Sequence, residues 1–315
     1  MSSDDQRRVA ASVKQRLLNY SRDRGEVFNL VLVRFAVERL LYRLTQSPHA
    51  DAFVLKGAML FAAWTGKPHR PTQDVDLLGF GDPSTERLAS VFREIAVVDV
   101  EPDGLTFDPA SVQVEPIREE AIYDGLRVRL LVFLGTARVP LQVDVGFGDV
   151  ITPGPQDLTF GPMLDLPAPR LRTYPPETVV AEKLDAIIVL GMANSRMKDY
   201  FDLWTLRQTT AFEMTPLRAA IEATLDRRGT PMPTTLPVGL TESFAEDESK
   251  QKQWAGFIRK MGDARGTPAL AEVVGLVRAF LEPVIIAASN VRADRWPAGG
   301  SWIRNAQDST DTSDH

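Results

Sequence analysis

Asp74 and Asp76 flank Val75 in an otherwise apolar segment, and their type and spacing suggest chemistry. Side chains alternate between the two faces of a strand, so a strand over 74–80 places both carboxylates on one face. Two like charges held this close in a half-buried position stay ionised when a cation lies between them, and a divalent metal ion does this well. A solvent-facing strand with an ion pair to Arg70 is the alternative, and the Asp-x-Asp pattern alone does not decide between the two.

Asp144 is a third acid in an apolar strand pattern, on the face opposite Val143 and Val145. If its strand lies beside the strand of Asp74 and Asp76, three carboxylates meet. Three carboxylates can hold two Mg²⁺ ions about 3.5–4 Å apart, an arrangement used for in-line nucleotidyl transfer. One ion would activate the attacking hydroxyl group, and the other would stay with the nucleoside triphosphate and stabilise the leaving pyrophosphate.

The composition narrows the choice of metal and reaction. The 315 residues are 44% hydrophobic and 25% charged, as expected for a globular protein of about two domains. The absence of cysteine excludes thiol nucleophiles and Cys-based zinc sites, and three histidines leave carboxylates as the main metal ligands, which favours Mg²⁺, Ca²⁺ or Mn²⁺. The sequence contains neither a P-loop motif nor a G-x-S-x-G elbow, which argues against a P-loop kinase and an α/β hydrolase.

Hydrophobic periodicity and turn residues predict the elements that position these acids. The predicted elements are helices over 6–20, 26–46, 177–192 and 196–208, strands over 74–80 and 97–100, and a hairpin of 126–135 with 139–148. Seven prolines within 149–176 indicate a boundary. We therefore expect an α/β region over 1–150, a helical region over 151–292 and a disordered tail over 293–315.

The net charge of −6 argues against general binding of nucleic acid, but the charge is unevenly distributed. Residues 1–50 carry nine Arg or Lys against five acids. Two helices with solvated basic faces would explain this excess, and the alternative is a patch that contacts an RNA backbone. We find no signal peptide and no apolar run long enough to span a bilayer, so we expect a cytoplasmic protein without a membrane partner.

Two later segments place charged residues beside apolar stripes. Lys183 lies next to Leu184 at the edge of such a stripe, where a lysine directed at a triphosphate acts as a point charge on its oxygens. An ordinary solvated helix face is the alternative. Arg196, Asp199 and Asp202 follow at spacings of three and share one helix face, where a structural salt bridge between Arg196 and Asp199 is the alternative to a site.

The order of these motifs resembles the AbiEii/AbiGii-type toxins, which include the MenT group. The segments "LKGAMLFAAW" (Leu55–Trp64) and "RPTQDVDLL" (Arg70–Leu78) resemble the family's Lys-Gly-Gly turn and its Arg-x-Ser/Thr-x-Asp-hydrophobic-Asp element. Further on, "VVAEKLDAI" (Val179–Ile187) and "SRMKDYFDLWTL" (Ser195–Leu206) resemble its Glu-Lys-Leu-x-Ala and Arg-x-x-Asp-x-x-Asp-Leu elements. Four motifs in the family's order are far more specific than any one of them.

The resemblance implies an α/β fold: a polymerase-beta-like nucleotidyltransferase with a mixed sheet, two leading helices and a helical C-terminal region. The implied reaction is Mg²⁺-dependent transfer of a nucleoside monophosphate from an NTP to the 3′ end of tRNA, which blocks translation, with Mn²⁺ as an alternative ion. The implied setting is a toxin–antitoxin or phage-defence system, with an antitoxin encoded by a neighbouring gene. The implied site residues are Asp74, Asp76 and Asp144 for metal and catalysis, Lys183 and Asp199 for catalysis, Lys56, Gly57, Arg70, Thr72, Lys183 and Arg196 for nucleotide binding, and Asp202 in support.

Three other functions compete with this interpretation. Transfer of a nucleotide to a protein side chain would use the same residues. A non-catalytic module that binds nucleotide or a partner would not need the complete set of carboxylates, and metal-dependent glycosyl transfer would leave the motifs of Lys183 and Asp199 unexplained.

Overall fold

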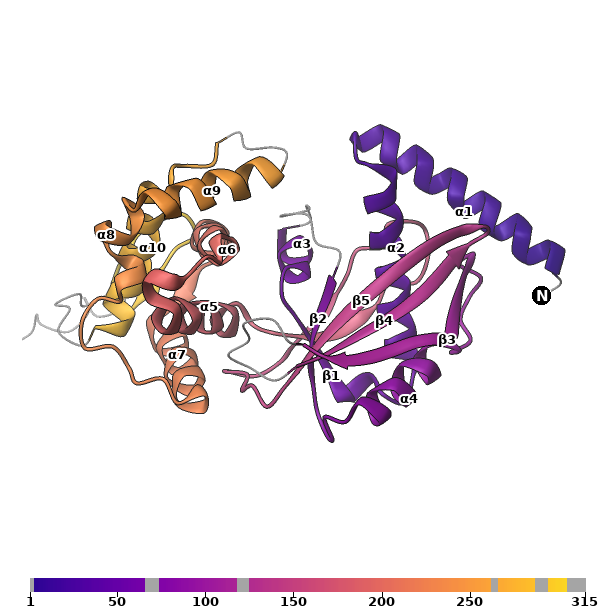
Figure 1. Ribbon diagram of the computed structural model, residues 1–315, viewed down its shortest axis with the longest axis horizontal. Helices are drawn as coiled ribbons and strands as arrows, with labels where there is room; N and C mark the ends of the chain where they lie inside the picture. The colour runs from indigo at the N-terminus through magenta and orange to yellow at the C-terminus, as the bar shows by residue number, and fades with distance from the viewer. Residues whose placement is uncertain (1–2, 66–73, 118–124, 262–265, 287–293, 305–315) are drawn as a thin grey trace, which may run out of the picture. The chain divides into compact units, whose positions relative to one another are not determined.

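The computed structural model describes residues 3–65, 74–117, 125–261, 266–286 and 294–304, and it divides into two compact units (Figure 1). Unit 1 comprises Met1–Asp149 and Pro155–Tyr174, and unit 2 comprises Val150–Gly154 and Pro175–His315. The division differs from the predicted boundary at residue 150 because two short strands of the proline-rich stretch join the sheet of unit 1.

A seven-stranded mixed sheet forms the centre of unit 1, in the order β3-β4-β5-β2-β1-β7-β6. β2 pairs in parallel with β5 and β1 with β7, whereas the other neighbours are antiparallel. The mixed α/β class is therefore as predicted. The strands are β1 (Phe53–Lys56), β2 (Asp74–Gly79), β3 (Leu105–Pro116), β4 (Gly125–Leu134), β5 (Ala137–Phe147), β6 (Gln156–Thr159) and β7 (Arg170–Thr173).

Helices of unit 1 pack against this sheet. The helices are α1 (Ser3–Arg24), α2 (Phe28–Gln46), α3 (Met59–Thr65) and α4 (Thr85–Ala96), with a 3₁₀ turn at Ala50–Ala52. α2 packs against β5 and α4 against β3, and in the ribbon α2 passes behind the strands (Figure 1). Val75 and Val143 are fully buried, while their neighbours Asp76 and Asp144 are only partly so, as strand alternation predicts.

The two leading helices differ in what their basic residues do. Arg39 and Arg43 of α2 are buried and both donate to the carboxylate of Asp103, which lies just before β3. Arg39 also donates to the carbonyl oxygen of Pro167. This network fixes the segment after α4, where a strand over 97–100 was predicted and the structure has none. The exposed basic residues of this region are those of α1.

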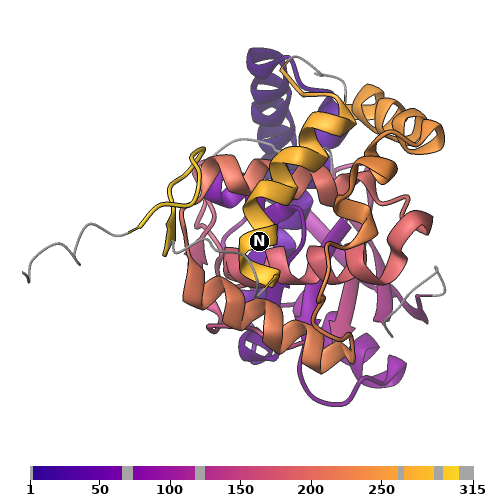
Figure 2. The same ribbon diagram turned by 90° about the vertical axis from the view of Figure 1, so that its left-hand side faces the viewer.

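Unit 2 consists mainly of helices, and Figure 2 shows the ribbon from the side on which these helices lie toward the viewer. α5 packs along α7, and α10 packs against α6 and α8. The helices are α5 (Pro176–Leu190), α6 (Met197–Thr209), α7 (Met214–Arg228), α8 (Glu242–Ala245), α9 (Glu248–Met261) and α10 (Leu270–Ile285), with 3₁₀ turns at Gly191–Ala193 and Val238–Leu240. Among the described residues, no helix has the length and apolarity required to cross a membrane.

Residues 294–304 are ordered, where a disordered tail over 293–315 was predicted, and the rest of that tail lies outside the described residues. β9 (Arg295–Trp296) pairs with β8 (Phe212–Glu213) in a two-stranded sheet. The Trp296 ring packs edge-on against Phe280 of α10, and the Trp302 ring stacks on the ring of Phe280. The composition of the stretch is polar, but two tryptophans supply enough apolar area to bind it to unit 2.

Candidate active site

One row of charged side chains crosses the sheet of unit 1. The strand register places Lys56 of β1 beside Asp76 of β2, Asp76 beside Asp144 of β5, and Asp144 beside Arg127 of β4. Directly opposed residues project from the same face, so the row carries one cation, two carboxylates and a second cation. The structure thus confirms that the strand of Asp144 lies beside the strand of Asp74 and Asp76.

Gly57 makes room for the carboxylate of Asp76. A Cβ atom at this position would lie 1.9 Å from Asp76 Oδ2, closer than any side chain allows. The backbone of Gly57 also has a φ of +77°, which favours glycine. The turn between β1 and α3 therefore has a structural reason to keep this glycine, and its role in nucleotide binding stays a prediction. Arg70 and Thr72, the other predicted contacts of this region, lie outside the described residues.

Arg127 holds Asp144 through two parallel hydrogen bonds. Arg127 Nε donates to Asp144 Oδ1 and Nη2 donates to Oδ2, each over 2.8 Å. The two side chains are 17% and 19% exposed, so water screens this ion pair only partly. The sequence-based interpretation missed Arg127, although counting outward from the turn after Leu134 would have placed it opposite Asp144.

Lys56 reaches past the row to Asp149. Its ammonium group lies 2.9 Å from Asp149 Oδ2 and 5.5 Å from the centre of the Tyr174 ring. Asp149 follows the end of β5, where no strand pattern marks it, so sequence reasoning missed it too. Lys56 is therefore held at the edge of the carboxylate row by an acid and an aromatic face.

The two carboxylates of the row, together with Asp74 on the same face of the sheet, are suitable ligands for a hard divalent cation. Asp74, Asp76 and Asp144 offer only oxygen atoms, which Mg²⁺ and Mn²⁺ prefer. Within the part of the chain that the structure describes, however, no group of three or more acids or histidines lies close enough to hold a metal ion. Arg127 engages both oxygen atoms of Asp144. The metal-binding role of Asp74, Asp76 and Asp144 stays a prediction.

Unit 2 contains a second charged cluster, at the facing sides of α5 and α6. Lys183 Nζ lies 2.9 Å from Asp199 Oδ1 and 2.7 Å from Asp202 Oδ2. Arg196 Nε donates to the second oxygen atom of Asp199 over 2.7 Å, as the structural alternative for this pair predicted. The side chains of both aspartates are 1% exposed, while that of Lys183 is 14% exposed.

The ionisation of Asp199 reflects two opposing effects. Burial disfavours its charged form most strongly, but the charges of Lys183 and Arg196 outweigh burial, so the pKa of Asp199 lies below its usual value. Asp199 is thus an ionised carboxylate that orients Lys183. Its predicted role as a catalytic acid, and the predicted nucleotide contacts of Lys183 and Arg196, stay predictions.

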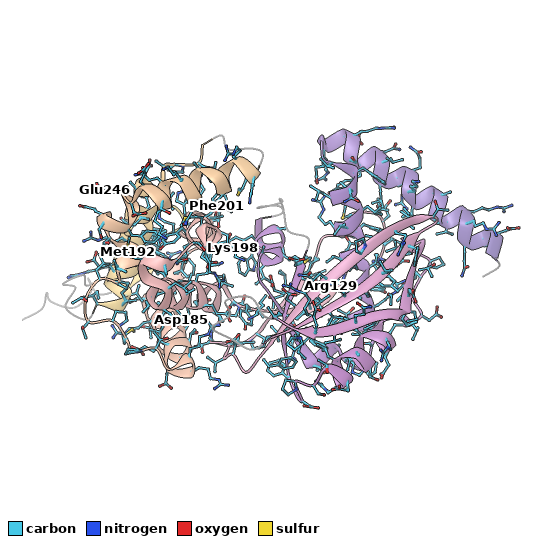
Figure 3. All side chains as sticks on the ribbon, in the orientation of Figure 1. Arg129, Asp185, Met192, Lys198, Phe201 and Glu246 are labelled. Atoms are coloured by element: carbon cyan, nitrogen blue, oxygen red, sulfur yellow. The ribbon has the colours of Figure 1, made fainter. Side chains whose placement is uncertain are left out.

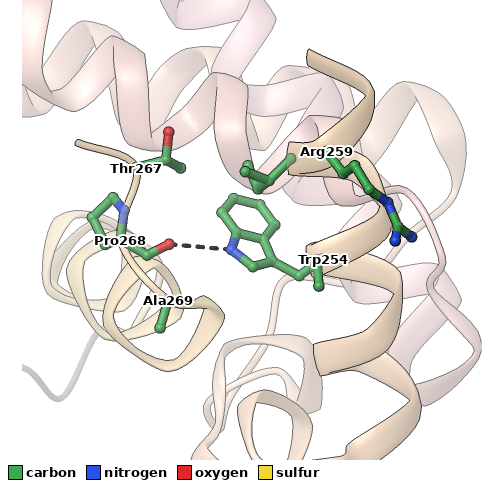
Figure 4. Close-up of a pocket in the computed structure, with 7 residues that line it drawn as sticks. Trp254, Arg259, Thr267, Pro268 and Ala269 are labelled. Atoms are coloured by element: carbon green, nitrogen blue, oxygen red, sulfur yellow. Dashed lines mark hydrogen bonds between the residues drawn. The ribbon is translucent and has the colours of Figure 1, made fainter. Parts of the chain in front are cut away.

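A shallow cavity of unit 2 offers a contrast to these clusters (Figure 4). It lies between α9 and the start of α10, where the indole nitrogen of Trp254 donates to the carbonyl oxygen of Pro268. Its lining includes the cation of Arg259 but no carboxylate. The cavity therefore lacks the carboxylate ligands that would hold the metal of a metal–nucleotide complex.

Comparison with known proteins gives one family. A family model described as "Nucleotidyl transferase AbiEii toxin, Type IV TA system" matches residues 39–275. No curated protein sequence matches the chain. Among solved structures, a candidate nucleotidyltransferase from H. pylori is similar at 12% identity and a TM-score of 0.45, over 81% of this chain and 93% of that one. JHP933 from Helicobacter pylori is similar at 12% identity and a TM-score of 0.46, over 81% and 91%. Both TM-scores are below 0.5, so the family model alone makes the assignment.

Proposed function

The chain belongs to the AbiEii family of nucleotidyltransferase toxins, and we propose that it transfers a nucleoside monophosphate from an NTP to the 3′ end of tRNA in a Mg²⁺-dependent reaction. Released pyrophosphate is the second product. A tRNA with a blocked 3′ end no longer accepts an amino acid, so translation stops. As the toxin of a type IV toxin–antitoxin system, the protein has an antitoxin as its partner.

The register of Asp76 and Asp144 is the observation that carries this proposal. The two carboxylates lie side by side on parallel strands, and Asp74 lies on the same face two residues before Asp76. Neighbouring carboxylates repel each other, so holding them side by side on a sheet costs free energy. A divalent cation between them would remove this cost and supply the Lewis acid that nucleotidyl transfer needs.

We assign each side chain of the site a role. Asp74 and Asp76 would hold the metal, and Asp144 would be the third ligand. Lys56, fixed by Asp149, provides a positive charge at the edge of the row, where it can attract phosphate oxygens. We propose that Lys183 also binds the triphosphate, with Asp199 and Asp202 orienting its ammonium group.

The exposed cations of α1 support an RNA acceptor. Arg8, Lys14 and Arg22 are exposed on this helix, and the guanidinium group of Arg24 lies 4.2 Å from the centre of the Tyr20 ring. Exposed cations and an aromatic ring on one helix suit the phosphates and bases of RNA. A protein acceptor would not require it.

The proposal is tested by incubating the purified chain with Mg²⁺, each α-labelled NTP in turn, and either total tRNA or total protein. We expect label in the tRNA fraction, removed on digestion of the 3′ terminal nucleotides. Label in protein alone would replace tRNA with a protein acceptor. No label in either fraction, with a folded protein and all four NTPs, would contradict nucleotidyl transfer.

A further inference from the structure

We propose that Arg127 is an internal counter-cation of the active site, which occupies Asp144 and must release it before a divalent cation can use that carboxylate. The proposal rests on the proposed function in taking Asp74 and Asp76 as metal ligands. Arg127 is a positioning residue in this account, because it acts through Asp144 and not on the substrate.

The geometry of the pair explains why it competes with a metal. Arg127 engages both oxygen atoms of Asp144 at 2.8 Å, so neither oxygen keeps its most favourable lone pair for another cation. The pair is also largely shielded, at 17% and 19% exposure. Each charge-assisted bond is then stronger than its equivalent at an open surface.

The choice of partner by Arg127 is specific. In the register, Arg127 stands opposite Glu115 of β3 on one side and Asp144 of β5 on the other. Its two parallel bonds go to Asp144, while Glu115 forms an ion pair with Arg129, two residues further along the same face of β4. These two bonds place the guanidinium group on the acid that lies opposite Asp76 in the register.

The charge balance of the row indicates what Arg127 achieves. Asp76 and Asp144 are adjacent, and their repulsion without a metal is offset on the Asp144 side by Arg127. Arg127 therefore holds the carboxylate of Asp144 in a defined position. A divalent cation that binds Asp76 reaches Asp144 only when the guanidinium group moves away. The apparent metal affinity of the free protein is therefore lower than that of a site in which all three carboxylates are available to the metal.

The test is Mn²⁺ binding to the free full-length chain, measured by electron paramagnetic resonance without nucleotide. Arg127→Gln should bind Mn²⁺ about tenfold or more tightly than the wild type, because it removes competing charge-assisted hydrogen bonds. Arg129→Gln is the matched control, since it changes the same residue type on the same strand and face, where Figure 3 labels Arg129. Its Mn²⁺ affinity should equal that of the wild type.

Two further variants separate competition from misfolding. Arg127→Lys keeps the charge but loses the second hydrogen bond, so its Mn²⁺ affinity should fall between those of wild type and Arg127→Gln. Adding Asp144→Asn to Arg127→Gln should abolish the gain, while Asp144→Asn alone should change the wild-type affinity much less. This pattern requires a folded Asp144 site and would not arise from a general loss of structure.

The outcomes are distinct from those of the transfer assay. Equal Mn²⁺ affinity in wild type and Arg127→Gln overturns the proposal, and so does a weaker affinity, which would mean that Arg127 assembles the metal site. A tighter affinity that survives Asp144→Asn also overturns it, because the gain would then come from another ligand. If Mn²⁺ binding follows the predicted pattern and no NTP is consumed, the counter-cation stands and the proposed function fails.

Discussion

A substitution of Lys183 affects its ion pairs and its proposed nucleotide contact together. Its ammonium group neutralises two carboxylates that are 1% exposed, so its removal leaves buried charges without a partner. The sequence motif predicts Lys183 as a nucleotide contact with Asp202 in support, but not the ion pair between Lys183 and Asp199. The loss of stability must therefore be separated from the loss of binding.

Lys183→Met should lower NTP affinity by about tenfold or more, because a hydrogen bond to a charged group contributes ~1.5–3 kcal/mol. Lys183→Met should also lower the melting temperature of unit 2, whereas Lys183→Arg should lower this temperature much less. Lys198→Ala, an exposed lysine of α6 that Figure 3 labels, is the control and should change neither. NTP titrations at a temperature where each variant is folded give the comparison. Unchanged affinity in folded Lys183→Met would leave Lys183 a purely structural residue.

The lowered pKa of Asp199 predicts that the stability of the fold decreases at low pH. Its pKa in the folded chain is lower than the ordinary 3.8, so the unfolded chain binds the proton more readily. The stability that Asp199 contributes is therefore complete above about pH 4 and falls as the pH drops below it. The melting temperatures of wild type and Asp199→Asn should converge as the pH falls from about 7 to about 3. A constant difference over this range would contradict the assigned pKa direction.

At the level of elements, α2 is held to the loops beside it by buried charge. Asp103 accepts hydrogen bonds from Arg39 and Arg43 and from the backbone nitrogen of Leu105. Such a network is costly to break, because the remaining guanidinium groups cannot reach water.

Asp103→Asn should lower the free energy of unfolding of unit 1 by about 3–5 kcal/mol, the usual cost of breaking a buried ion pair. Asp157→Asn is the control, since its ion pair with Arg170 is exposed and should be worth at most ~1 kcal/mol. Hydrogen exchange of the α2 amides reports the change within this unit. Equal protection of α2 in the two variants would show that the network does not stabilise the helix.

The exposed face of α1 gives a prediction about RNA. Replacing Arg16, Arg22 and Arg24 with Gln should raise the KM for tRNA and lower the slope of log affinity against log salt by about 0.7–0.9 for each phosphate group that the helix no longer neutralises. NTP binding should stay the same. Arg218→Gln, which removes an exposed cation of unit 2, is the control. An unchanged salt slope in the triple variant would remove α1 from the RNA-binding surface.

The sequence predicted elements better than it predicted contacts. Strand alternation placed Asp74, Asp76 and Asp144 on the polar face, because a two-residue period is a local property of the chain. The pairing of Arg127 with Asp144 depends on the register of the β4–β5 hairpin and on a side-chain choice between two acids. The ordering of 294–304 depends on the apolar surface of α10, which a polar composition cannot reveal.

At the scale of the whole molecule, the region that matches the family model contains residues of both units. The family assignment covers 39–275 and therefore includes both the carboxylate row and the motifs of Lys183 and Asp199. Membership in a type IV toxin–antitoxin family predicts growth arrest when the chain is expressed without its antitoxin. If the arrest depends on catalysis, it must disappear with the charge of a single carboxylate.

Induced expression of wild type beside Asp76→Asn, with sequencing of tRNA 3′ ends, tests this claim most directly. Asp157→Asn, an exposed aspartate of the same unit, is the matched control and should act as wild type. We predict growth arrest and extended tRNA ends with wild type and control, and neither effect with Asp76→Asn, although it folds and accumulates equally. Arrest by Asp76→Asn to the same extent, or extended tRNA ends in its presence, would contradict the account.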